Sequence, residues 1–312
     1  HFMLLVSGKE IKSSISMPKA INCVAKGFSD FNDGLFRMPQ RSMMDIEGAT
    51  VLTMPSYRKD GKYFVIKVVT VFNYSMNKKD KMINSSVLVF DSINGELLAK
   101  LDGDSITSIR TGAASGLATK YFSSPKSEVL AIFGTGVQAT TQVEAVVSCR
   151  PIKKIFVYSR NVKSAKRFSN YIHNFHSINA YPGNEQDLKN ADIICTATPS
   201  ENSLFDFDAI KNGVHINAIG SFKPYMKEIH KDIINSSKII VDSLEACKEE
   251  AGDLIQAKNE SDWDFDNVFI QLGEASKIEE EFIDLHQENT LFKSVGLAFQ
   301  DLVIVEFLMH NL

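Results

Sequence analysis

Hydrophobic residues follow two different patterns along this chain. From residue 50 to residue 101, short apolar runs rich in Val, Ile and Phe alternate with turn residues, among them Asp60-Gly61, a stretch at 77–80 and Asn94-Gly95. Asn-Gly between two such runs is a strong signal for a β-hairpin. The pattern predicts an antiparallel meander with strands at residues 51–54, 63–72, 86–90 and 97–101.

The segments on either side of this meander have helical spacing. Residues 17–32 are predicted to form a helix with Pro18 in its first turn, after a short strand that begins at residue 3 and before an extended segment at 35–42. Residues 106–122 form a second predicted helix, which is dense in Ala, Gly, Thr and Ser and has Asp104 and Ser105 as its cap.

Beyond residue 127, apolar strand-like runs alternate with helical segments. Strands are predicted at 128–133, 154–158, 178–181, 191–198, 214–220 and 238–242, and helices at 137–149, 244–258 and 278–287. This alternation implies a parallel, doubly wound sheet. The last apolar run, 295–309, predicts a helix that returns to pack on the first domain.

The two patterns together predict an α/β protein with two domains. We expect a Rossmann-type doubly wound domain at residues 125–289 and a smaller α+β domain with an antiparallel sheet at residues 3–124, joined by a C-terminal helix within 290–312. A length of 312 residues agrees with two domains.

Composition excludes several classes of function. A net charge of −4 gives no basic surface for nucleic acid, and no apolar run approaches the roughly 20 residues of a membrane span. No signal peptide is visible, so we expect a cytoplasmic protein with reduced cysteines, because its four cysteines form no C-x-x-C pair. His173 and His176 lack further ligand residues nearby in sequence, so we expect a solvated helix face and no metal site.

A glycine turn at residues 134–139, Gly-Thr-Gly-Val-Gln-Ala, lies between a predicted strand and a predicted helix. Strand, turn, helix and second strand within about thirty residues is the context in which G-x-G-x-x-A binds a dinucleotide. The first glycine permits the tight turn, the second lets the backbone approach a pyrophosphate, and Ala139 allows close packing of the helix on the sheet. The candidate cofactor-binding residues here are Gly134, Thr135, Gly136, Val137 and Gln138.

The end of the next strand indicates which dinucleotide is bound. An acidic residue there would favour NAD(H), whereas this chain has Ser159, Arg160 and Asn161. A guanidinium with two small polar neighbours suits a 2′-phosphate, so NADP(H) is favoured over NAD(H). The alternative is that Arg160 only stacks on adenine. Thr196, Thr198 and Ile219, near the ends of later strands, are further cofactor-binding candidates.

Several spaced blocks carry a family resemblance. They read MPQR at 38–41, IKVVT at 66–70, IRTGAAS at 109–115, INAIG at 216–220, LGE at 272–274 and FKSVG at 292–296. With these blocks the chain resembles the ornithine cyclodeaminase/mu-crystallin family, which also includes archaeal alanine dehydrogenases and cyclic ketimine reductases. The resemblance implies a homodimer formed through the antiparallel sheet.

The resemblance also implies a substrate site. Arg41, Lys67 and Arg110 would converge on the carboxylate of a small imino or amino acid, with Val295 and Gly296 as further substrate-binding residues. Lys67 and Arg110 are the catalytic candidates. A lysine at the centre of an apolar strand supports this independently, because burying its charge is costly unless the charge is used.

Two positions depart from the family pattern. Cyclodeaminases and alanine dehydrogenases of the family carry an acid/base Asp two residues after the glycine that ends the fifth strand, and Phe222 stands there in this chain. Met82 stands where some members carry a hydroxyl. An aromatic ring cannot accept a proton, so the departure at Phe222 weakens the case for cyclodeamination.

We therefore expect an NAD(P)H-dependent reductase of a cyclic imino acid such as pyrroline-2-carboxylate or piperideine-2-carboxylate. Ornithine cyclodeaminase or a related amino-acid dehydrogenase is the nearest alternative. A non-catalytic protein that retains NADPH is the alternative from a different class. The sequence does not indicate the size of the substrate ring.

Overall fold

The computed structural model describes residues 3–72, 83–278 and 285–311. The chain forms two compact units, residues 1–110 with 297–312, and residues 111–296. The chain passes from the first unit to the second within helix α3 (Gly103–Phe122) and returns to the first unit after Gly296. The predicted boundaries were after this helix, at residues 124 and 125, and at residues 289 and 290. The predicted turn at 77–80, residue Met82 and most of the predicted helix at 278–287 lie outside the described residues.

The first unit contains a seven-stranded sheet in the order β1-β7-β6-β5-β4-β2, with β3 also paired to β4. Strands β4 to β7 pair antiparallel in sequence order, so the predicted meander is confirmed. Gly95 and Asp60 take positive φ angles in two of its turns, 75° and 59°. The strands are β1 (Leu4–Val6), β2 (Phe36–Arg37), β3 (Ser42–Ile46), β4 (Ala49–Arg58), β5 (Tyr63–Phe72), β6 (Ile83–Asp91) and β7 (Leu97–Asp102).

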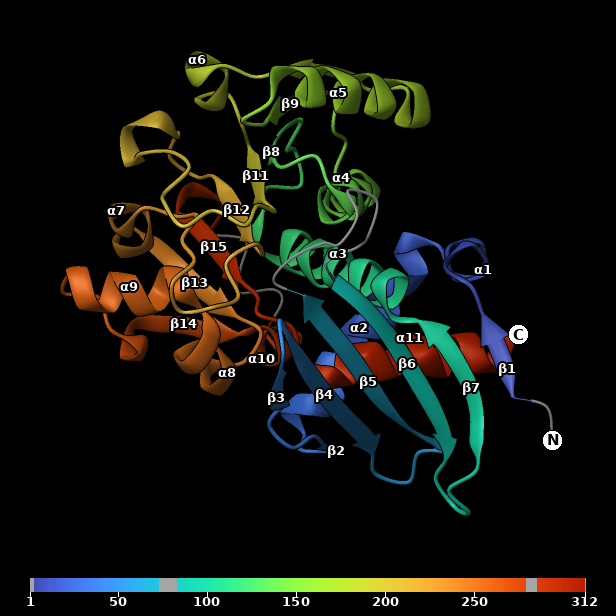
Figure 1. The fold of residues 1–312 in the computed structure, drawn as a ribbon. Coiled ribbons are helices and arrows are strands. Elements are labelled where there is room, and N and C mark those ends of the chain that lie inside the picture. The colour runs from blue at the N-terminus through green and yellow to red at the C-terminus, as the bar shows by residue number, and fades with distance from the viewer. Residues whose placement is uncertain (1–2, 73–82, 279–284, 312) are drawn as a thin grey trace. The chain divides into compact units, whose positions relative to one another are not determined.

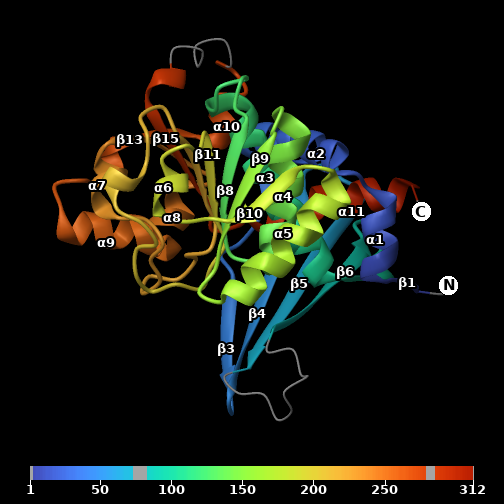
Figure 2. The same ribbon diagram turned by 90° about the horizontal axis from the view of Figure 1, so that it is seen from above.

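Helices α2 (Met17–Asn32) and α11 (Ala298–Asn311) pack on each other, and α11 also contacts β4 and β5 (Figures 1 and 2). Gly27 permits this close approach, since a Cβ there would lie 3.0 Å from Val303 Cγ1. Phe299 packs against the rings of Phe28, Phe31 and Phe36. The predicted return of the C-terminal helix to the first domain is therefore confirmed.

The second unit contains an eight-stranded sheet in the order β10-β9-β8-β11-β12-β15-β13-β14, and every pair in it is parallel. Alternate residues of its strands join two separate apolar clusters: one includes α4 (Val137–Cys149) and α5 (Val162–His176), and the other includes α7 (Lys231–Asn235), α8 (Leu244–Glu250) and α9 (Gly252–Glu260). Helices thus cover both faces, which confirms the doubly wound fold.

The remaining elements of this unit complete the sheet. Its strands are β8 (Val129–Phe133), β9 (Lys154–Tyr158), β10 (Asn179–Pro182), β11 (Ile193–Thr196), β12 (His215–Ala218), β13 (Ser237–Val241), β14 (Val268–Gln271) and β15 (Asn289–Lys293). Two short helices, α6 (Glu185–Leu188) and α10 (Leu272–Ala275), connect strands.

Several boundaries differ from the sequence predictions. Helix α3 begins at Gly103, and the Asp102 carboxylate accepts the N–H of Ser105, so the predicted cap at Asp104 and Ser105 was wrong. Ala251 separates α8 from α9, where one helix was predicted. Helix α11 begins after Gly296, whose φ of 85° is not helical. Strands β14 and β15 and helix α1 (Gly8–Ser14) were not predicted.

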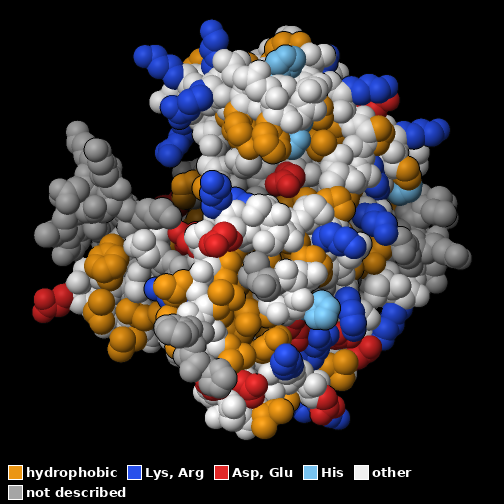
Figure 3. Space-filling model, turned by 90° about the vertical axis from the view of Figure 1, so that its right-hand side faces the viewer, with side chains coloured by type: hydrophobic (Ala, Val, Ile, Leu, Met, Phe, Trp, Pro, Cys, Tyr) orange, Lys and Arg blue, Asp and Glu red, His pale blue; other side chains and the backbone are white. Residues whose placement is uncertain are grey.

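Surface charge agrees with the composition. Figure 3 shows Lys and Arg side chains interleaved with hydrophobic and acidic ones on one face, which therefore presents no continuous basic surface. Within the described ranges, no helix combines the length and the apolar character that crossing a membrane requires.

Candidate functional site

Lys67 lies at the centre of the first unit's sheet, on β5, with Met54 and Val87 as its cross-strand neighbours. Its side chain is on the face covered by α11, and its Nζ lies 3.1 Å and 3.3 Å from the two carboxylate oxygens of Asp301. Lys67 is 2% exposed and Asp301 0%. A charge this deeply buried requires a partner, and Asp301 is the one that the sequence analysis missed.

Arg110 joins this cluster from α3. Its Nη1 donates to Gln300 Oε1 at 3.0 Å, and its Nε lies 3.5 Å from Asp301 Oδ1. Gln300 Oε1 also accepts the N–H of Leu297, which fixes the orientation of the amide. Arg110 Nε and Gln300 Nε2 are both buried without a hydrogen-bond acceptor among the described residues. Because buried donors are nearly always paired, these two indicate a position for an acceptor from a ligand.

Arg41 lies near the same cluster. The segment that precedes it is tied to the start of α11, where Met38 Sδ accepts the N–H of Phe299. The Arg41 guanidinium is close enough to Lys67 to lower the pKa of the lysine amine. The structure therefore brings the three predicted substrate-binding side chains, Arg41, Lys67 and Arg110, into one region.

The balance of charge in this cluster favours an anion. Among the described residues, two cations, Lys67 and Arg110, share the one carboxylate of Asp301. The pKa of Lys67 is lowered to about 8, chiefly by burial and in smaller part by Arg110 and Arg41, while Asp301 opposes the shift. An amine with this pKa can both hold a proton and donate it near neutral pH.

The glycine turn of the second unit has the geometry that a dinucleotide requires. Gly134 has a φ of 109°, and a Cβ there would lie 2.6 Å from the carbonyl oxygen of Ala197. Gly136 caps α4 without a side-chain hydrogen bond, and a Cβ there would contact nothing within 4 Å. Ala139 is fully buried against the sheet. The backbone at Gly136 therefore leaves room for a ligand beside the N-terminus of α4, where anions are favoured.

The other predicted cofactor-binding residues, in the glycine turn and at the end of β9, differ in how exposed they are. Thr135 and Gln138 are part-buried, Val137 is exposed, and Gln138 Oε1 is buried without a partner. Arg160 is exposed. The Asn161 side-chain oxygen accepts two backbone N–H groups of α5, so this oxygen caps the helix.

The two threonines predicted to bind the cofactor, Thr196 and Thr198, contact a buried acid. Thr196 and Thr198 donate their hydroxyls to Glu228 at 2.8 Å and 2.7 Å, and Glu228 also accepts the N–H groups of Thr198 and Gly220. Glu228 therefore links the ends of β11 and β12, next to Ile219. The sequence analysis missed it because a Glu in a polar loop has no pattern that distinguishes it from a solvated residue.

Glu228 belongs to a fully buried group of charges. Asp253 accepts the backbone N–H groups of Glu228 and Ile229, and its other oxygen binds Lys293 Nζ at 2.8 Å. Burial raises the pKa of Glu228, and the Asp253 charge raises it further, while Lys293 opposes both. These contacts fix the backbone at the carboxyl edge of the sheet.

Val295 and Gly296, predicted to bind substrate, are held by Asp242. One Asp242 oxygen accepts their two N–H groups at 2.9 Å and 2.8 Å and the hydroxyl of Ser294 at 2.8 Å. Their N–H groups are thus already used. Phe222 is 39% exposed in the loop after β12 and brings no proton acceptor.

His173 and His176 were predicted to lie on a solvated helix face and to hold no metal ion. His173 Nδ1 lies 3.2 Å from the carbonyl oxygen of Ile178, which ties the end of α5 to the chain that follows. Within the described ranges, no group of three or more His, Cys, Asp or Glu side chains is arranged to hold a metal ion.

Comparisons with known proteins agree with this fold. The model of the ornithine cyclodeaminase/mu-crystallin family matches residues 2–312. The Delta(1)-pyrroline-2-carboxylate reductase of Bacillus cereus is 35% identical, over 99% of this chain and 96% of that protein. The ketimine reductase mu-crystallin of Rattus norvegicus is 29% identical, over 96% of this chain and 93% of that protein.

A solved structure is also similar. The Delta(1)-pyrroline-2-carboxylate reductase of Thermococcus litoralis, in complex with NADH and L-proline, has a TM-score of 0.92 and 32% identity, and the match covers 99% of this chain and 97% of that one. These relatives are named as pyrroline-2-carboxylate reductases or as a ketimine reductase. The chain belongs to the ornithine cyclodeaminase/mu-crystallin family.

Proposed function

We propose that this chain reduces a small cyclic imino acid, such as pyrroline-2-carboxylate or piperideine-2-carboxylate, with a reduced nicotinamide dinucleotide. The buried cluster of Lys67, Asp301 and Arg110 carries the proposal, because it combines a proton donor with buried donors that lack an acceptor. An imino acid supplies a carboxylate for the donors and an imine nitrogen for Lys67. The names of the similar proteins support the same reaction.

Each side chain of the cluster has a distinct part in the reaction. Arg110 and Gln300 bind the substrate carboxylate through their unpaired N–H groups, and Arg41 adds a second positive charge. Lys67 donates a proton from Nζ to the imine nitrogen, and Asp301 holds the resulting amine in place. A bound nicotinamide dinucleotide supplies the hydride that adds to the carbon beside the carboxylate. One proton and one hydride convert the imine to the cyclic amino acid.

The residues of the glycine turn would hold the dinucleotide. The free N–H groups at the start of α4 would bind its pyrophosphate, and Gly136 would allow the backbone to approach. Ser159 and Arg160, at the end of β9, support NADP(H) over NAD(H). We infer a cytoplasmic location because reduced nicotinamide dinucleotides are metabolites of the cell interior.

Cyclodeamination is less well supported. It requires a group that accepts a proton near the side-chain amine of ornithine, and Phe222 provides none where the family's cyclodeaminases carry Asp. Release of ammonia and proline from ornithine in the presence of NAD would favour it. Retention of a dinucleotide without turnover of any imine would favour a non-catalytic binding protein.

We also propose that the chain forms a homodimer through the first unit's sheet. The face of the sheet opposite Lys67 carries part-exposed apolar side chains from two adjacent strands, Phe64, Ile66, Val68, Leu88 and Phe90. A contiguous apolar patch of this kind is typical of an interface. Light scattering coupled to gel filtration tests the mass, and a monomer at micromolar concentration would contradict the dimer.

The reaction is tested by following dinucleotide oxidation at 340 nm with a panel of cyclic imino acids. Five- and six-membered imines with an adjacent carboxylate are expected to be reduced, and the matching imines without the carboxylate are the control. Because the cluster binds the carboxylate, removing it is expected to abolish activity. Equal rates with and without the carboxylate would sink the proposal.

A further inference from the structure

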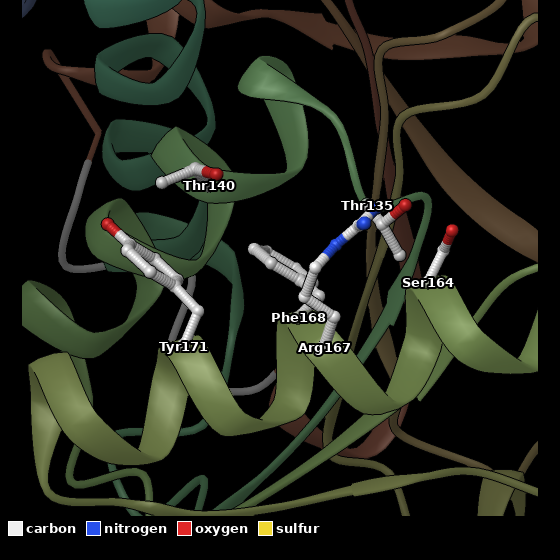
Figure 4. Close-up of a pocket in the computed structure, with 6 residues that line it drawn as sticks. All are labelled: Thr135, Thr140, Ser164, Arg167, Phe168 and Tyr171. Atoms are coloured by element: carbon white, nitrogen blue, oxygen red, sulfur yellow. The ribbon is translucent and has the colours of Figure 1, made fainter.

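A pocket of about 350 Å³ lies between the glycine turn with α4 and the helix that follows the second strand, α5. Its lining combines three hydroxyls, one guanidinium and two aromatic rings: Thr135, Thr140, Ser164, Arg167, Phe168 and Tyr171. Figure 4 shows the Arg167 side chain running from α5 toward Thr135 on the glycine turn. The pocket thus adjoins the segment that would hold the pyrophosphate.

The positive charges near the start of α5 are unusual for a helix N-terminus. Arg160, Lys163, Lys166 and Arg167 lie within eight residues, and α5 contains no acidic residue. Of the helical cations, Lys163 in the first turn opposes the helix macrodipole. In the part of the chain that the structure describes, none of the four forms an ion pair with a carboxylate. An anion bound at this position would relieve the unfavourable arrangement.

Only one of these helical cations lines the pocket. Ser164, Arg167 and Tyr171 are spaced three and four residues apart, so they share the face of α5 that borders the pocket. Lys163, Lys166 and Arg167 are all exposed, and of the three only Arg167 is part of the lining.

The lining provides donors and lacks a competing anion. None of its six side chains is acidic. Glu144 raises the pKa of Tyr171, but less than burial does. Arg167, Thr135 and Ser164 are thus free to offer several donors to one group.

We propose that this pocket takes the 2′-phosphate of NADP(H), and that Arg167 determines the preference for the phosphorylated dinucleotide. This inference rests on the proposed function, and it adds a residue of α5 to the strand-end residues Ser159 and Arg160. A phosphate monoester has three acceptor oxygens and close to two negative charges, which match a guanidinium fork and neighbouring hydroxyls. A carboxylate would use fewer of these donors.

The test is isothermal titration with 2′,5′-ADP and with 5′-AMP, which differ only by the 2′-phosphate. The wild type is expected to bind 2′,5′-ADP more tightly. Arg167→Gln is expected to weaken 2′,5′-ADP by about tenfold to a hundredfold, as for loss of a charge-assisted hydrogen bond, and to leave 5′-AMP unchanged. Lys166→Gln removes the same charge one residue away and is the matched control, with an expected change below about twofold.

Three results would overturn the proposal. They are equal weakening by the two variants, no preference of the wild type for 2′,5′-ADP, and competition by inorganic phosphate as strong as that by 2′,5′-ADP. The titration needs no turnover. Tight 2′,5′-ADP binding without reduction of any imine would therefore contradict the proposed function alone. Reduction of an imine with NADH, without a preference for 2′,5′-ADP, would contradict only the role of Arg167.

Discussion

The substitution Asp301→Asn tests the role of the buried cluster. It removes the carboxylate that lies 3.1 Å from Lys67 Nζ and keeps the shape of the side chain. Two unit charges about 4 Å apart interact by about 4 kcal/mol at an effective dielectric constant of 20. At 1.36 kcal/mol for each pH unit, loss of this attraction lowers the pKa of Lys67 by about 3.

The pKa of Lys67 in the wild type determines how much activity the variant loses. With a pKa of about 8, Lys67 is mostly protonated at pH 7. In the variant, the protonated fraction at pH 7 falls from about nine in ten to about one in a hundred. If Lys67 is the proton donor, kcat/KM for the imine at pH 7 falls by at least about tenfold, even when the bound carboxylate restores part of the charge.

The assay is the dependence of kcat/KM on pH, followed at 340 nm. The wild type is expected to lose activity as the pH rises above about 8, because Lys67 then loses its proton. The variant is expected to lose activity at lower pH and to recover it in acid. Asp30→Asn is the control, since it breaks the ion pair with Arg58, which also binds Glu306 of α11. An Asp301→Asn profile that coincides with the wild type would refute the reasoning.

Three further predictions concern the second unit. Gly134→Ala is expected to destabilise the fold by about 1–3 kcal/mol and to abolish dinucleotide binding, because φ is 109° and the new Cβ would lie 2.6 Å from the carbonyl oxygen of Ala197; unchanged urea unfolding would contradict this. Burial lowers the pKa of His215 from 6.5 to about 3, so the unfolded chain takes up its proton first as the pH falls, and stability is lost below pH 6.5. Between pH 6.5 and pH 5, His215 is expected to reduce the free energy of unfolding by about 2 kcal/mol, at 1.36 kcal/mol for each pH unit. Denaturant unfolding at both pH values measures this loss. A smaller loss in the wild type than in His215→Gln would contradict the prediction. Glu228→Gln is expected to cost about 1–3 kcal/mol in unfolding and to weaken dinucleotide binding, because an amide cannot accept from the N–H of Gly220 and the other donors together; stability and binding equal to wild type would show that the carboxylate is dispensable.

Most of the fold could be predicted because its signals are local. The Gly95 and Asp60 turns, the strand that contains Lys67 and the helix after Gly136 all depend on residues close in sequence. Strands β14 and β15 were missed because their runs, Val268–Gln271 and Asn289–Lys293, are short and include polar residues.

The site was only partly predictable for the opposite reason. Lys67 could be found because a lysine in an apolar strand violates the pattern around it. Its partner Asp301 lies 234 residues away, in a largely apolar helix that gives no sign of which strand it covers. Glu228 was invisible for a related reason, since its burial depends on contacts with Thr196, Thr198 and Gly220. Such pairings arise only when the chain is folded.

Hydride transfer to the substrate carbon is the central claim, and isotope transfer measures it directly. The purified chain is incubated with pyrroline-2-carboxylate and reduced nicotinamide dinucleotide that carries deuterium at both C4 positions, and the product is analysed by mass spectrometry. We expect proline with one deuterium on the carbon that bears the carboxylate, in equal amount to the dinucleotide oxidised. Dinucleotide oxidation without deuterium in proline, or no proline at all, would contradict the account.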